Sequence, residues 1–111
     1  MTHGKVKDVA VVWLVGRIVL GKDTGDLRAK VKGLLDEGYK KLVLNMEEVN
    51  LVDSSGLGAL VSLHYTANSC GATLRLCNLG SKFKDVMYMT KLHTVFEVCA
   101  TQADALSSFS K

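Results

Sequence analysis

The segment Asn50-Leu51-Val52-Asp53-Ser54-Ser55-Gly56-Leu57-Gly58-Ala59-Leu60 decides the fold, because it marks the point where a strand ends and a helix begins. The residues before Asp53 are typical of a strand at its exit, and two glycines fall in the first turn of the expected helix. One carboxylate and two hydroxyl groups stand between the two elements. A strand-to-helix turn can direct backbone N–H groups at ligands or side chains on the rim of a sheet. We therefore expect any functional site to lie here.

Up to three predicted strands precede this segment. Val9–Val15 is almost wholly apolar and rich in β-branched residues, which favours a strand covered on both faces. Gly16 breaks the run, and Arg17–Leu20 resumes it as a short second strand or an extended turn. Lys41–Asn45 is the next strand, with an apolar centre. We interpret Met46–Val52, which contains two adjacent glutamates, as a solvated loop.

A helix is predicted between these strands. It begins near Gly21, where the side chain of Asp23 or Thr24 can accept a hydrogen bond from a free backbone N–H group. Gly38 is well placed to end it in a left-handed conformation. The apolar face of the helix repeats at i, i+4, i+7 and i+8, formed by Leu27, Val31, Leu34 and Leu35.

The second half of the chain continues the alternation of helices and strands. A helix runs from Ser55 to about Gly71, and the strand Thr73–Cys77 follows it. A third helix begins after the turn Leu79–Ser81, and a short strand covers Thr94–Val98. A last helix opens at Thr101–Asp104, which resembles a capping box with aspartate in place of glutamate.

Strands that alternate with helices indicate an α/β domain whose helices pack on a mostly parallel sheet. We expect a mixed sheet of four to five strands with about four helices, in a single domain over residues 1–111. Functional residues in such sheets gather outside the carboxyl ends of the strands. Asp53 and Ser54 would lie at such an end.

Composition excludes several classes of protein. The 111 residues are 48% hydrophobic and 23% charged, and the formal net charge is +3. The one local basic cluster, Lys82, Lys84 and Lys91, is interrupted by Asp85, so we expect no nucleic-acid partner. No segment approaches eighteen uninterrupted apolar residues, and no signal peptide is evident, so we expect no membrane insertion and a cytoplasmic location.

The three cysteines, Cys70, Cys77 and Cys99, form no metal-ligand spacing. We predict buried free thiols in a reducing compartment, and neither a metal nor a cofactor.

A catalytic serine is poorly supported. A nucleophilic serine needs a base within hydrogen-bond reach, and Ser54 is not framed by the glycines of a nucleophile elbow. His3 falls near a chain end, His64 lies on the apolar stripe of its own helix, and His93 completes no triad. A small hydrolase using Ser54 remains the alternative from the class of enzymes.

The roles of the two glycines and of the two serines in the central segment each remain open. Gly56 and Gly58 either let the helix pack close to a neighbouring backbone or leave a shallow surface for a partner; a phosphate-binding loop is disfavoured because the Walker lysine is absent. Ser54 or Ser55 either caps the helix, with Asp53 held by backbone bonds, or serves as a phosphate acceptor. A phosphate there would be stabilised by the helix dipole.

The segment Val52–Leu60 resembles the signature of the STAS domain, especially that of bacterial anti-sigma-factor antagonists. The resemblance covers nearly the whole chain. Further matches in the family's order are Gly16, the strand Lys41–Asn45, Gly71 and the segment Thr90-Lys91-Leu92 with Val95-Phe96.

This resemblance implies a partner-switching regulator rather than an enzyme. In that family the unphosphorylated antagonist binds an anti-sigma factor that is also a serine kinase, which releases the sigma factor for transcription. The kinase phosphorylates the hydroxyl directly after the aspartate, and a serine phosphatase restores binding. Carried over, Ser54 is the phosphate acceptor, Asp53 shapes the site and Ser55 is a weaker candidate. The implied partner-binding residues are Gly56, Leu57, Gly58, Ser62 and Tyr65.

One departure concerns the recognition of the site. Many antagonists carry an acidic residue shortly after the glycine of the first strand, where this chain has Arg17, Val19 and Leu20, and the nearest acid is Asp23. The alternative within the family is a STAS scaffold that is not phosphorylated and serves as a subunit of a signalling or lipid-transport complex.

Overall fold

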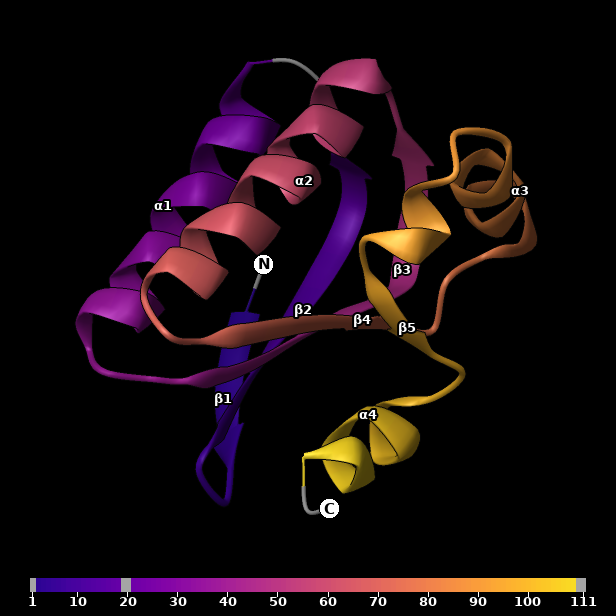
Figure 1. Cartoon of the computed structure of the whole chain (residues 1–111). Coiled ribbons are helices and arrows are strands. Elements are labelled where there is room, and N and C mark those ends of the chain that lie inside the picture. Colours follow the sequence, from indigo (N-terminus) through magenta and orange to yellow (C-terminus); the bar gives the residue numbers. More distant parts are fainter. Residues whose placement is uncertain (1, 19–20, 110–111) are drawn as a thin grey trace.

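The computed structural model describes residues 2–18 and 21–109, and the chain is built on a five-stranded sheet in the order β1-β2-β3-β4-β5 (Figure 1). The strands are β1 (Thr2–Val6), β2 (Val9–Ile18), β3 (Lys41–Val52), β4 (Thr73–Cys77) and β5 (Glu97–Cys99). β1 pairs with β2 in the antiparallel sense, and the other pairs are parallel. The predicted α/β class and mostly parallel mixed sheet are confirmed.

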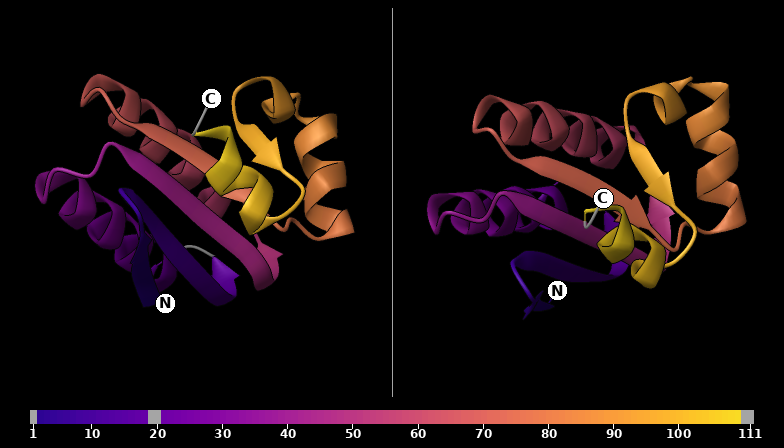
Figure 2. Two further views of the ribbon diagram at one scale, coloured as in Figure 1. Left: turned by 90° about the horizontal axis from the view of Figure 1, so that it is seen from below. Right: turned by 60° about the horizontal axis from the view of Figure 1, so that its bottom comes forward.

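Four helices connect and cover the strands. They are α1 (Lys22–Asp36), α2 (Ser54–Ser69), α3 (Ser81–Met89) and α4 (Gln102–Ser108), and a 3-10 turn, η1 (Leu92–Thr94), follows α3. α1 and α2 lie side by side on one face of the sheet, whereas α4 packs on the other face (Figures 1 and 2). α3 stands apart from α1 and α2, beside the far end of β3 (Figure 2).

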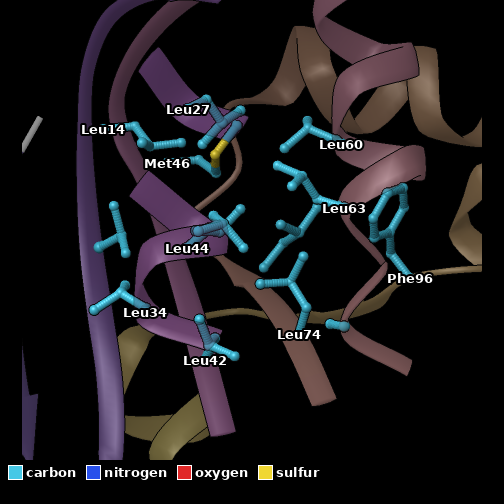
Figure 3. Packing of buried hydrophobic residues seen from close by; sticks show 14 of the residues in the cluster. Leu14, Leu27, Leu34, Leu42, Leu44, Met46, Leu60, Leu63, Leu74 and Phe96 are labelled. Atoms are coloured by element: carbon cyan, nitrogen blue, oxygen red, sulfur yellow. The ribbon is translucent and has the colours of Figure 1, made fainter. Parts of the chain in front are cut away.

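The alternation of side chains along β2 explains why its sequence is apolar throughout. Ala10, Val12 and Leu14 pack in the larger core beneath α1 and α2, while Val9 and Val11 pack in a smaller core beneath α4. The prediction of a strand covered on both faces is therefore confirmed for Val9–Leu14, whereas Val15 is exposed. Figure 3 shows the larger core, in which leucines from α1, α2 and the strands interdigitate. Each such leucine contributes about 1.5–3 kcal/mol by leaving water.

Three predictions about strands are corrected. β1 was not expected, because its residues show little apolar alternation; its pairing with β2 holds it in the sheet. Met46–Val52 is no loop, since β3 continues without interruption to Val52. Gly16 does not end β2, which reaches Ile18 with register shifts against β3 between Trp13 and Val15 and between Gly16 and Arg17. The last part of the predicted strand Arg17–Leu20, Val19 and Leu20, lies outside the described residues.

The predicted strand Thr94–Val98 is shorter and begins later than expected, because η1 occupies residues 92–94 and β5 pairs with β4 only from Glu97. The start of α1 also differs. Its N-cap is Gly21, and the hydroxyl of Thr24 donates to the Gly21 carbonyl instead of accepting at the cap (3.0 Å). The alternative cap, the side chain of Asp23, lies outside the described part of the structure.

The predicted ends of two helices are confirmed. Gly38 has a φ of 98°, and its N–H group donates to the Leu35 carbonyl just past the end of α1. Thr101 caps α4, accepting a hydrogen bond from the backbone N–H of Asp104 (3.1 Å).

All three cysteines are free thiols, but the prediction that all are buried is wrong for Cys70, which is exposed. Cys77 is fully buried and Cys99 is half-buried. Burial raises the pKa of the Cys77 thiol to about 11 and also raises the pKa of Cys99. Within the part of the chain that the structure describes, no helix has the length and apolar character needed to cross a membrane.

Candidate functional site

The site arises from the unequal lengths of neighbouring strands. β3 has 12 residues, but β4 pairs only with its first part, Lys41–Asn45. Beyond that point β3 is paired on one side alone, with β2, up to Val52. The other side of this part of β3 faces α3 (Figure 2), and residues of both elements line a groove.

The groove has a volume of about 620 Å³ and apolar walls. Leu51 from β3 and Val86 from α3 are both exposed there, at 51% and 42%. Pockets of this size with apolar walls and a few polar groups are typical of recognition sites. Three elements line it, namely the end of β3 (Val49, Asn50, Leu51, Val52), the turn into α2 (Asp53, Ser54, Leu57) and the start and inner side of α3 (Gly80, Ser81, Lys82, Phe83, Val86, Thr90).

Asp53 fixes the turn between β3 and α2. Its carboxylate Oδ1 accepts a hydrogen bond from the backbone N–H of Gly56 (2.7 Å), which makes Asp53 the N-cap of α2. Its own N–H group donates to the carbonyl of Ile18 at the end of β2 (3.3 Å). The interpretation that Ser54 or Ser55 caps the helix is therefore wrong, and neither hydroxyl is needed as the cap.

The two glycines of the first turn differ in their surroundings. Gly56 is buried, and a Cβ atom on it would lie 2.0 Å from the carbonyl oxygen of Ile18. A Cβ atom on Gly58 would meet nothing within 4 Å. Close backbone packing, one of the two interpretations of these glycines, thus holds for Gly56, whereas Gly58 is exposed.

The structure brings most of the predicted site residues to one side of α2. Ser54 is exposed as the first residue of the helix, and Gly58, Ser62 and Tyr65 follow it on the same stripe at i+4, i+8 and i+11. Leu57 is half-buried and lines the groove with Ser54. Gly56 lies underneath, and Ser55 is half-buried and does not line the groove.

Sequence reasoning missed the far wall of the groove. Lys82 was noted only in a basic cluster, Phe83 and Val86 fell within the predicted third helix without a functional role, and Leu51 fell within the predicted loop Met46–Val52. The apolar residues Val49, Leu51 and Val52, two of them β-branched, are the signal that could have extended β3. No local pattern could have placed α3 opposite Ser54, because that depends on where β4 ends.

Little in the site favours catalysis. Among the described residues, no three His, Cys, Asp or Glu side chains come together as metal ligands. His64 lies ten residues beyond Ser54 on the same helix, about 15 Å along its axis, with its ring against Phe96. His3 is in β1, and the side chain of His93 is not among those that the structure describes. The charged residues lining the groove, within the described ranges, are Asp53 and Lys82.

Comparison with known proteins agrees with this architecture. The family model described as "STAS domain" matches residues 5–105. A protein of Thermotoga maritima described as a candidate anti-sigma factor antagonist is 28% identical over 72 residues, which is 65% of this chain. That match covers 64% of the relative, so the chain spans just under two thirds of the curated relatives it matches.

Solved structures share the fold. The crystal structure of a candidate anti-sigma factor antagonist from Thermotoga maritima superimposes with a TM-score of 0.91 at 22% identity, covering 99% of this chain and 94% of that one. The phosphorylated form of the Bacillus cell-fate determinant SpoIIAA superimposes with a TM-score of 0.74 at 19% identity, covering 97% of each chain. Because the family model matches residues 5–105, nearly the whole chain, the chain belongs to the STAS domain family.

Proposed function

We propose that this chain is an anti-sigma factor antagonist of the bacterial cytoplasm, which binds an anti-sigma factor with serine kinase activity and loses that binding when Ser54 is phosphorylated. The observation that carries the proposal is the position of Ser54. Its hydroxyl is exposed at the first residue of α2 and borders an apolar groove large enough to receive side chains of a partner. A serine phosphatase would reverse the switch.

The fold should tolerate a phosphate at this position. Phosphorylation adds about −1.5 to −2 charges, which the positive end of a helix dipole stabilises. Because Asp53 already caps α2, Ser54 is not needed for the helix to start. The modification should therefore leave the domain folded while it changes the surface that a partner meets.

A docked partner should not tolerate the same phosphate. Partner side chains would cover Leu57 in the groove and the stripe of Gly58, Ser62 and Tyr65 beside it. Burying a dianion against apolar side chains without counter-charges is costly. Ser54 is thus a residue that is acted upon, in accordance with a protein that is not itself an enzyme.

The test is phosphorylation by the GHKL-type serine kinase of the organism that encodes this chain. We expect a mass increase of one phosphate with ATP, which is lost in Ser54→Ala. Ser81→Ala is the matched control, since Ser81 also begins a helix and lines the same groove. Undiminished phosphorylation of Ser54→Ala would refute the assignment of the acceptor.

Binding is the second measurement. Titration calorimetry should give weaker binding of the kinase to Ser54→Asp than to wild type. Ser55→Asp adds the same negative charge one residue further along, and unchanged binding of the kinase to it would show that the effect depends on the position of the charge. Equal affinity of Ser54→Asp and wild type would contradict the switch and favour a STAS scaffold that is not phosphorylated.

A further inference from the structure

We propose that Lys82 is the internal counter-ion of a phosphate on Ser54, so that phosphorylation links α2 to α3 across the groove. The inference rests on the proposed function, because it assumes that Ser54 receives a phosphate. It adds a mechanism to the switch: the phosphate would obstruct the groove from within, in addition to repelling a partner.

Ser54 and Lys82 line the same groove from two different helices. Ser54 is the first residue of α2, Lys82 is the second residue of α3, and both are exposed. The start of α3 lies beside the end of β3, from which α2 departs, in the right-hand view of Figure 2. Leu57 and Phe83 line the same groove, so the flexible side chain of Lys82 would reach toward a phosphate on Ser54 past apolar neighbours.

Among the described residues lining the groove, Lys82 is the cation available to form an ion pair with the phosphate. Asp53 is the other charged residue among the described lining residues, and its carboxylate is bound to the N–H of Gly56 at the cap. Within the described ranges, no hydrogen bond or ion pair holds the ammonium of Lys82. It can therefore turn toward Ser54 without breaking an existing contact.

Lys84 provides a natural comparison on the same helix. It is also exposed, but it lines a separate cavity of about 260 Å³ on another side of α3, together with Tyr88 and Val98. A general effect of positive charge on α3 would involve both lysines. An ion pair across the groove would involve Lys82 alone.

The chemistry suits a lysine. An ammonium group on a flexible stem presents three donors and adapts to a phosphate as a point charge. Hydrogen bonds between two charged groups are short and roughly twice as strong as neutral ones. Both groups are exposed, so the pair remains sensitive to salt.

The experiment uses the full chain with phosphoserine incorporated at position 54 during translation, so that no kinase is needed. Phosphorus NMR then follows the titration of the phosphate. We expect the second phosphate pKa to be about half a unit lower in wild type than in Lys82→Gln, because the ammonium favours the dianion. Lys84→Gln should titrate like wild type, and Lys82→Arg should restore the lower value.

Two results would overturn the proposal. One is identical phosphate titration in wild type and Lys82→Gln, and the other is an equal shift in Lys82→Gln and Lys84→Gln. Since the phosphate is installed directly, failure here is distinguishable from failure of the proposed function, which would appear as absence of Ser54 phosphorylation by the kinase. Far-ultraviolet circular dichroism of each variant checks that the domain is folded.

Discussion

The backbone of Gly56 lies so close to the end of β2 that a Cβ atom on it would stand 2.0 Å from the carbonyl oxygen of Ile18. This contact sets the position of the first turn of α2 and therefore of Ser54. Gly56→Ala must displace the helix start, and we expect it to lower the free energy of unfolding by about 1–3 kcal/mol. Urea denaturation measures the change.

Gly58→Ala is the control for this prediction, since it makes the same substitution two residues along the same helix. A Cβ atom there would meet nothing within 4 Å. Alanine favours a helix over glycine by about 1 kcal/mol, so Gly58→Ala should raise the free energy of unfolding. If both variants were stabilised, placing a Cβ atom on Gly56 against the Ile18 carbonyl would cost no stability, and the prediction would be wrong.

The cap of α2 gives a second prediction. Asp53→Ala removes the acceptor of the Gly56 N–H bond and should lower the free energy of unfolding by about 1 kcal/mol. Asp53→Asn retains an acceptor oxygen and should lose less. Ser55→Ala should change stability by less than about 0.5 kcal/mol, because Asp53 provides the cap. A larger loss in Ser55→Ala than in Asp53→Ala would reverse this assignment.

A third prediction concerns the polar link between β3 and α4. The buried Asn45 donates from Nδ2 to Gln102 Oε1 (2.8 Å) and accepts at Oδ1 from the N–H of Glu47 (3.0 Å). Asn45→Ala should lower the free energy of unfolding by about 1–3 kcal/mol, because it leaves a backbone donor without its partner.

Gln102→Ala should cost less, since Gln102 is half-exposed and water can replace its amide. The double variant separates the pair from its surroundings, and thermal unfolding of the four proteins measures the coupling. Strictly additive losses would mean that the hydrogen bond between Asn45 and Gln102 contributes nothing.

Much of the fold could be predicted because its signals are local. The β-branched apolar run Val9–Val15 favours a strand, and the spacing of Leu27, Val31 and Leu34 favours a helix, through their own residues. The turn at Asp53 was located for the same reason, since a carboxylate and two hydroxyls between apolar segments mark a helix start.

The errors lie where tertiary contacts override local patterns. Two adjacent glutamates suggested a loop, but β4 ends at Cys77, so the second half of β3 borders a groove on one side and can carry exposed charges. β1 forms because it pairs with the edge of β2, although the residues of β1 have little strand preference. The groove depends on where β4 ends, which is a tertiary feature, so Lys82 could not be associated with Ser54 from the sequence.

A fourth prediction follows from the buried thiol of Cys77. Burial, with smaller contributions from Cys99 and Glu47, raises its pKa from an ordinary 9.0 to about 11. Between these values the unfolded chain releases the thiol proton while the folded chain retains it. The folded state then binds more protons, so the free energy of unfolding falls as pH rises from about 9 to about 11, by about 2–3 kcal/mol at most from this group.

Cys77→Ala should therefore show a shallower loss of stability over this alkaline range, even though the cavity it creates lowers stability at every pH. Urea denaturation at intervals from pH 7 to pH 11 measures the slope. Cys70→Ala is the matched control, because Cys70 is exposed and its variant should follow the wild-type slope. Lysine deprotonation contributes equally to all three proteins, so parallel slopes for Cys77→Ala and Cys70→Ala would contradict the raised pKa of Cys77.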